Sequence, residues 1–212
     1  SNLIKLGAPG LLLGLVAVGC TPGARVSSFS SVAAKPDKQA ARRAANAEAA
    51  IKARKPEIAV AAAEQAVSLM PRNAAYRTTL GQAYLLAGRF TSAEASFAEA
   101  LRLDPMPGKT SFNLALTQIA LGKWNVARDT LARLDGVMPD ADVGLAVALA
   151  GDRDGGIVIL ERGARAEGAG VKARQNLALA YALAGRWNDA QTVAAQDVAP
   201  AELLQRISDW SK

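Results

Sequence analysis

The stretch YLLAGRFTSA, residues 84–93, recurs as QIALGKWNVA at residues 118–127 and as YALAGRWNDA at residues 181–190. Each copy has a small apolar run, a glycine, a basic residue, an aromatic residue and a closing alanine in the same order. A catalytic site is not needed three times in one chain, so the repetition indicates architecture rather than chemistry. We interpret the stretch as the turn between two helices that the chain builds repeatedly.

The repeat has a period of 34 residues. Pro71, Pro105 and Pro139 follow one another at steps of 34, whereas the step from Gly122 to Gly151 is only 29. A period of 34 residues is that of helix–turn–helix repeats. We expect five units, the first at about residues 38–71 and a shortened fourth at about residues 138–167.

The letters of the units resemble the tetratricopeptide repeat (TPR). The second unit carries the fullest set of its signature positions: Leu80, Gly81, Tyr84, Gly88, Phe90, Ala93, Phe97, Ala100 and Pro105. The third unit has Gln118 where the tyrosine is expected. The resemblance implies an all-α fold, an α-solenoid of about five TPR-like helix pairs with a C-terminal capping helix, over residues 38–212.

Four local features are expected inside the units. The turn glycines should end the first helix in the left-handed conformation: Gly88, Gly122 and Gly185. The polar residues that follow should cap the second helix: Thr91, Asn125 and Asn188. The turn aromatics should lie wedged between the two helices: Phe90, Trp124 and Trp187. Small residues should face each other where the helices cross: Gly81, Ala115 and Ala178 against Ala93, Ala127 and Ala190.

A capping helix is predicted after the last unit. The sequence PAELLQRISDW, residues 200–210, places four apolar side chains on one helical face: Leu203, Leu204, Ile207 and Trp210. Pro200 suits the first turn of such a helix. A terminal repeat needs a cover for its exposed apolar face, and this helix would supply it.

The first twenty residues have the pattern of a secretory signal. Lys5 is followed by an apolar run at residues 11–19 and then by Cys20, the one cysteine of the chain. The ending Ala17-Val18-Gly19-Cys20 resembles a bacterial lipobox, which implies lipidation of Cys20; an ordinary buried cysteine in a short apolar helix is the alternative. Residues 21–37 are expected to be a flexible linker.

The resemblance also suggests where the protein lies and what it touches. Thr21, rather than aspartate, follows Cys20, which favours an outer-membrane lipoprotein that faces the periplasm and meets the membrane through its lipid anchor. Residues 35–57 hold seven basic and three acidic residues. This stretch is expected to be the solvated face of a first helix, or a contact with anionic headgroups.

Composition and failed motifs exclude several functional classes. The chain has no histidine and a single cysteine, which removes histidine metal sites, histidine-based triads and internal disulfides. GKT at residues 108–110 lacks the upstream glycine of a phosphate loop, and GDRDGG at residues 151–156 lacks the later ligands of a calcium loop. We expect no metal, no cofactor and no enzymatic activity, and read residues 151–156 as a turn. The charge of +6 comes without a basic stripe interleaved with stacking aromatics, so no nucleic-acid partner is expected.

The expected partner is a protein or peptide held in a concave groove. In TPR arrays the first helices of successive units line that groove, and the register assigns twelve residues to it: Thr78, Gln82, Leu85, Leu86, Phe112, Leu116, Ile119, Leu145, Leu149, Gln175, Leu179 and Leu183. Most are apolar, which suits a hydrophobic peptide or an amphipathic helix. The alternative is that tight winding of the array, or the protein's own N-terminal segment, fills the groove.

The whole layout resembles the TPR lipoproteins of alphaproteobacteria, and among these the Tad (Flp pilus) assembly lipoproteins of the TadD family. The stretch at residues 173–202 carries most of the likeness. The resemblance implies a factor that assists assembly or localisation of the pilus secretin and supplies no catalytic residues. A cell-envelope adaptor for peptidoglycan or other secretion machinery is the alternative.

Overall fold

The structure, a computed structural model, describes residues 35–105 and 108–210. The expected signal peptide, Cys20 and residues 21–34 of the expected linker lie outside this range. The first helix begins at Pro36, close to the expected start of the array.

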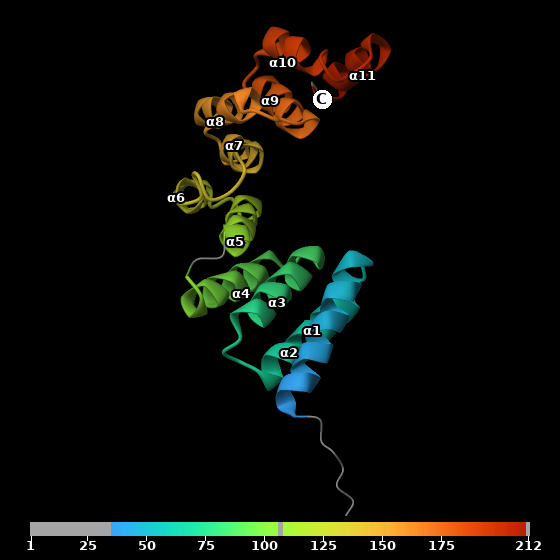
Figure 1. Cartoon of the computed structure of the whole chain (residues 1–212), viewed down its shortest axis with the longest axis vertical. Coiled ribbons are helices and arrows are strands. Elements are labelled where there is room, and N and C mark those ends of the chain that lie inside the picture. Colours follow the sequence, from blue (N-terminus) through green and yellow to red (C-terminus); the bar gives the residue numbers. More distant parts are fainter. Residues whose placement is uncertain (1–34, 106–107, 211–212) are drawn as a thin grey trace, which may run out of the picture. The chain divides into compact units, whose positions relative to one another are not determined.

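The described residues form eleven α-helices and no strand (Figure 1). In chain order these are α1 (Pro36–Lys52), α2 (Pro56–Leu69), α3 (Ala74–Leu86), α4 (Phe90–Leu103), α5 (Gly108–Ala120), α6 (Trp124–Ala132), α7 (Asp140–Leu149), α8 (Arg153–Arg165), α9 (Val171–Leu183), α10 (Trp187–Ala194) and α11 (Pro200–Trp210). The prediction of an all-α solenoid is confirmed. No helix within the described ranges has the length and apolar content needed to cross a bilayer.

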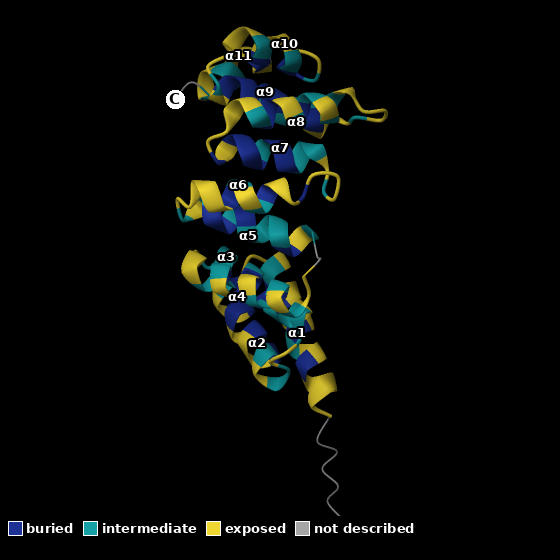
Figure 2. Ribbon diagram, turned by 90° about the vertical axis from the view of Figure 1, so that its left-hand side faces the viewer, coloured by how far each residue is buried: buried dark blue, intermediate teal, exposed yellow. Residues whose placement is uncertain are grey.

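The helices form five antiparallel pairs that pack one after another, followed by α11. We call α1, α3, α5, α7 and α9 the first helices, and α2, α4, α6, α8 and α10 the second helices. Each first helix packs on its own second helix and, after the first pair, on the second helix of the preceding pair. In Figure 2 the buried residues lie on the helix faces that meet these neighbours.

Each helix pair has two buried positions that are 16 residues apart in the chain, and in the second and fourth pairs the glycine at the first position lies against the side chain at the second. The five position pairs are Ala47/Ala63, Gly81/Phe97, Ala115/Leu131, Gly144/Leu160 and Ala178/Ala194. The first helix always contributes alanine or glycine, while the second helix contributes a residue of variable size. Because a protein interior is close-packed, the small residue makes room for its partner across the crossing.

The crossing differs in one pair from what the sequence predicted. A methyl group added to Gly81 would lie 2.6 Å from Cε1 of Phe97, and its three nearest atoms all belong to that ring, so Gly81 faces Phe97 rather than Ala93. In the fourth pair, for which no facing residues were predicted, two small residues meet: a methyl group added to Gly156 would lie 2.6 Å from the carbonyl oxygen of Gly144.

The turns between the helices of a pair use the left-handed conformation, as predicted. Gly88, Gly122 and Gly185 have φ angles of 69°, 72° and 75°. In the first pair Arg54 holds the corresponding place, two residues after the helix end, with a φ of 55°. A residue with a Cβ is strained in the left-handed conformation, so Arg54 has an unfavourable backbone energy that the glycines avoid.

The prediction that Thr91, Asn125 and Asn188 cap the second helices is wrong. The capping positions are occupied instead by Arg89, Lys123 and Arg186, without a side-chain hydrogen bond. The helices begin at the turn aromatic, so Thr91, Asn125 and Asn188 are already inside the first helical turn. Side-chain caps occur elsewhere, at Asn73 of α3 and at Asp152 of α8.

The prediction that the turn aromatics are wedged between the helices is also wrong. Phe90, Trp124 and Trp187 remain 38%, 48% and 39% exposed. Each is the first residue of a second helix and so lies at the end of the pair, whereas the crossing itself is filled by the alanines and by the residues that face them. These side chains are therefore available at one edge of the array.

The missing residues of the short repeat come from two helices. α6 has 9 residues and α7 has 10, whereas α4 and α5 of the preceding step have 14 and 13. The shortening thus falls at the end of the third pair as well as in the fourth. Leu134, just after α6, is buried and keeps the core continuous there.

α11 covers the end of the array, as predicted, with one exception. Leu203 is buried, and Ile207 and Trp210 pack against the core residues of α9 and α10. Leu204 is exposed instead, because the helix uses a narrower apolar face than the sequence suggested.

We predict that Gly81→Ala lowers the free energy of unfolding by about 1–3 kcal/mol, because the added methyl group overlaps the Phe97 ring. Adding Phe97→Leu should recover much of the loss, since it recreates the combination at Ala115/Leu131. A urea-denaturation double-mutant cycle measures the coupling. Additive effects of the two substitutions would contradict this account of the crossing.

We predict that Arg54→Gly stabilises the protein by roughly 0.5–1 kcal/mol, because it removes the left-handed strain of a residue with a Cβ. The gain is partly offset by the greater freedom of glycine in the unfolded chain. Thermal or urea unfolding gives the value. Arg72→Gly, a change at an exposed position with no positive φ, is the control and should not stabilise.

Candidate functional site

The first helices line one continuous side of the array. Each of them contacts the next first helix, α1 with α3, α3 with α5, α5 with α7 and α7 with α9. Successive second helices make no such contacts within the described part of the chain. A row of helix pairs whose first helices touch and whose second helices do not curves toward the side of the first helices. The first helices therefore lie on the inner side of the array, where a groove was expected.

None of the twelve predicted groove residues is fully buried. Ten are partly buried: Thr78, Gln82, Leu85, Leu86, Phe112, Leu116, Ile119, Leu145, Gln175 and Leu179. The other two, Leu149 and Leu183, are exposed at the ends of α7 and α9. The twelve side chains thus reach the surface of the first helices, as a binding surface requires. Binding by these residues stays a prediction.

The apolar middle of the row rests on the core of the third and fourth pairs. Phe112, Leu116 and Ile119 pack with their inner sides against the cluster that contains Ala115 and Leu131. The remaining surface of these three side chains is open. Because their lower parts are fixed by packing, little side-chain entropy would be lost when a partner covers the rest.

Polar contacts hold neighbouring first helices in register. The hydroxyl oxygens of Thr78 in α3 and Thr110 in α5 are 3.1 Å apart and share a hydrogen bond. Asn176 of α9 donates to the carbonyl oxygen of Ala141 in α7, with a distance of 2.7 Å. The same two helices are joined by an ion pair between Lys172 and Asp142. These contacts fix the spacing of the groove residues beside them.

Two first helices are also tied to the preceding pair through a tyrosine. Tyr181 donates to Glu161 of α8 at 2.7 Å, and the Arg186 guanidinium lies 4.4 Å from the centre of the tyrosine ring. Burial and this hydrogen bond raise the pKa of Tyr181 to about 12. The same hydrogen bond, with help from Arg165, lowers the pKa of Glu161.

Tyr84 repeats this arrangement in the second pair. It donates to Glu64 of α2 at 2.7 Å, and Arg89 lies 4.5 Å from its ring centre. Burial first, and then Glu64, raise the pKa of Tyr84. In these two copies of the repeated stretch the arginine therefore stacks on the tyrosine five residues before it.

At the third pair, both the tyrosine and the glutamate that form this hydrogen bond at the second and fifth pairs are missing. Gln118 replaces the tyrosine and is buried, and its side-chain oxygen accepts from Thr130 at 2.9 Å. Ala98 stands 20 residues before Gln118, whereas Glu64 and Glu161 stand 20 residues before Tyr84 and Tyr181. Lys123 pairs with Glu94 instead, at 2.6 Å. The departure from the TPR pattern at residue 118 is thus compensated locally.

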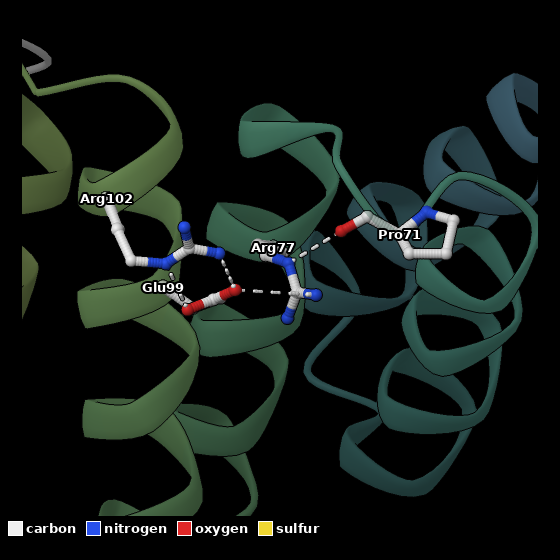
Figure 3. Close-up of polar contacts among 4 residues, drawn as sticks. All are labelled: Pro71, Arg77, Glu99 and Arg102. Atoms are coloured by element: carbon white, nitrogen blue, oxygen red, sulfur yellow. Dashed lines mark hydrogen bonds and ion pairs between the residues drawn. The ribbon is translucent and has the colours of Figure 1, made fainter.

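A surface network links α3 to its own pair and to the loop before it (Figure 3). Arg77 donates to the carbonyl oxygen of Pro71 at 2.8 Å and lies 3.9 Å from Glu99. Arg102 approaches Glu99 from the other side, and its hydrogen bond lowers the pKa of that carboxyl group. The closing proline of the repeat therefore offers its carbonyl group to the next helix.

Sequence reasoning missed a pocket at the edge of the array. The exposed Trp124 and Leu149 line a cavity of about 400 Å³ together with Arg128 and Arg153. Arg128 donates to the carbonyl oxygen of Ala150 at 2.7 Å, so two of the residues that line the pocket are joined by a hydrogen bond. The pocket exists because Trp124 is exposed at the end of the pair. The sequence pattern predicted Trp124 between the two helices and therefore did not predict the pocket.

The two motifs that were set aside have structural roles. Residues 108–110 form the first turn of α5. In GDRDGG only residues 151–152 belong to the turn, because α8 begins at Arg153, and the Oδ1 atom of Asp152 accepts from the backbone N–H of Gly155 at 2.9 Å. The described residues contain no group of three or more histidine, cysteine, aspartate or glutamate side chains placed to hold a metal ion.

Solved TPR structures share this fold. MamA 41-end from Desulfovibrio magneticus RS-1 is 17% identical, with a TM-score of 0.59 over 82% of this chain and 95% of that chain. The thermophilic TPR protein TTC0263 of Thermus thermophilus is 18% identical, with a TM-score of 0.63 over 81% of this chain and 98% of its own. Pseudomonas aeruginosa pilF is 15% identical, with a TM-score of 0.63 over 82% and 85%. No protein-family model and no curated protein matches the chain. The fold is that of a TPR protein.

We predict that Tyr181→Phe changes how stability depends on alkaline pH. A raised tyrosine pKa favours the neutral form in the folded state, so its contribution is complete below pH 10 and is lost as pH rises through about 12. The variant should lose about 0.5–1.5 kcal/mol near neutral pH with the hydrogen bond to Glu161. Between pH 10 and about 12 the unfolding free energy of the variant should then fall less steeply than that of the wild type.

Urea unfolding at a series of pH values measures both effects. Tyr76→Phe is the matched control, because Tyr76 donates no side-chain hydrogen bond in the described structure. An alkaline slope for Tyr181→Phe that equals the wild-type slope would show that Tyr181 is not the titrating group.

Proposed function

We propose that the chain is a non-enzymatic scaffold that binds a protein partner along its first helices. Two observations support the proposal: the first helices contact one another along one side of the array, and the twelve predicted groove residues on α3, α5, α7 and α9 keep exposed surface. Such a row matches an amphipathic helix or an extended apolar peptide, which would present apolar side chains at regular spacing.

The chemistry of the row supports binding rather than catalysis. Its polar members are Thr78, Gln82 and Gln175, none of which titrates near neutral pH. The strongest pKa shifts belong to structural ion pairs and to the tyrosine bridges, not to a cluster in a cleft. Groups with the roles of general acid, base and nucleophile do not converge on one point in the described residues.

We further propose that the protein is an outer-membrane lipoprotein that faces the periplasm and assists assembly of the Tad (Flp) pilus secretin. The lipobox-like ending at Cys20 and the likeness of residues 173–202 to the TadD family support this part of the proposal. The groove would then hold a segment of the secretin or of a subunit that accompanies it.

The test is a crosslinking pull-down from envelopes of the native host. We expect Leu116→Glu and Leu179→Glu to reduce recovery of the secretin at least tenfold, because each places a charge on the apolar row. Val158→Glu is the control. Val158 is 67% exposed on α8, outside the row, so its change adds the same charge without touching the groove.

Equal recovery from wild type, both groove variants and the control would exclude the groove as the binding surface. Recovery of peptidoglycan enzymes in place of the secretin, lost in the same two variants, would retain the scaffold and replace the pilus role. Circular dichroism of each variant checks that the helices remain folded.

A further inference from the structure

The positive charge of the protein is concentrated in its first helix pair. Residues 35–72 contain eight basic and four acidic residues, a net charge of +4. Residues 73–210 contain fourteen basic and fifteen acidic residues, a net charge of −1. The array is therefore electrically polar, and its basic end is the pair α1/α2.

The cations of this end have no ion-pair partner. In the part of the chain that the structure describes, none of the basic residues between 35 and 55 forms an ion pair. Many later cations differ, since Arg77, Lys123, Arg162, Lys172 and Arg174 pair with carboxylates, and the unpaired ones do not follow one another along a single helix. Charges left unpaired on one surface remain available to an external anion.

The unpaired cations form a stripe along α1. The helix is held to the array through four buried alanines, Ala40, Ala44, Ala47 and Ala50. With about 3.6 residues per turn, Lys38, Arg42 and Lys52 lie on the opposite side, within about 80° of one another. All three are exposed, as are Arg54 and Lys55 in the turn that follows, and exposed residues of α1 are yellow in Figure 2.

The stripe is long and flat rather than concave. Lys38 and Lys52 are about 21 Å apart along the helix axis at 1.5 Å per residue. Between them the outer face carries Ala45 and Ala49, which are exposed and small. Such a face lets three long cationic side chains reach one plane together.

We propose that α1 rests on an anionic lipid surface through this stripe. Bilayer headgroups present negative charge in a plane, and each lysine or arginine near such a plane adds attraction. α1 contains no aromatic residue, so stacking with nucleic-acid bases is not available to it. Its outer face lacks the large apolar anchors that protein interfaces need.

This inference is separate from lipidation of Cys20 and from partner binding in the groove. A lipid anchor would hold the chain near the membrane, and the stripe would set which end of the array meets it. The test therefore uses the full chain with Cys20→Ser, which cannot be acylated, and vesicles of phosphatidylcholine with or without about one third phosphatidylglycerol.

We expect the chain to bind the phosphatidylglycerol vesicles at least tenfold more tightly than the neutral ones in a sedimentation assay at about 0.1 M salt, and to lose the difference at about 0.5 M. Substituting Lys38, Arg42 and Lys52 by glutamine should reduce the difference at least tenfold. The difference between the two vesicle types is the readout, because the apolar run at residues 11–19 is present in every variant.

The matched control removes the same charge elsewhere. Lys109, Arg133 and Arg153 are exposed and form no ion pair in the described residues, and their substitution by glutamine should change binding less than twofold. If the two triple variants lost the same amount of binding to phosphatidylglycerol vesicles, net charge alone would explain the binding, and the proposal would be overturned. Equal binding to both vesicle types by the unsubstituted stripe would overturn it as well, and so would binding of the stripe to an acidic protein but not to the vesicles.

Discussion

The fold depends on one constraint, the close crossing of two helices in every repeat. At each crossing the first helix offers a residue no larger than alanine, and the side chain 16 positions later fills the space that remains. Gly81 accommodates the ring of Phe97, and Gly144 accommodates Leu160. Since the crossing fixes the angle and depth of each pair, it also sets which side of the first helix is free to face a partner.

The repeat period was sufficient to predict the number, order and pairing of the helices. It works because each unit must bury the same face against its neighbours, so the same apolar and small residues return at a constant spacing. The left-handed turn glycines were predictable for a similar reason, since few residues other than glycine take that conformation without strain. Arg54 shows that the turn is imposed by the packing of α1 and α2 even where the sequence opposes it.

Several side-chain positions could not be read from the sequence. The boundary between turn and helix shifted by two residues and placed Thr91, Asn125 and Asn188 inside helices rather than at their caps. That shift also moved Trp124 from the crossing to the edge, where it lines a pocket. Leu204 fits an amphipathic pattern but lies beyond the reach of α9 and α10. The twelve predicted groove residues do lie on the first helices α3, α5, α7 and α9, because the repeat period fixes where each first helix falls in the chain.

The contacts between first helices have a mechanical consequence. Each pair packs on the next through both its first and its second helix, and the described helices make no contacts beyond the neighbouring pair. Because each repeat packs only against its nearest neighbours, small changes in the angle at successive contacts add up along the array. The spacing between distant first helices can then widen or narrow as an elastic response. Partners of somewhat different length could be accommodated by flexure, without unfolding any helix.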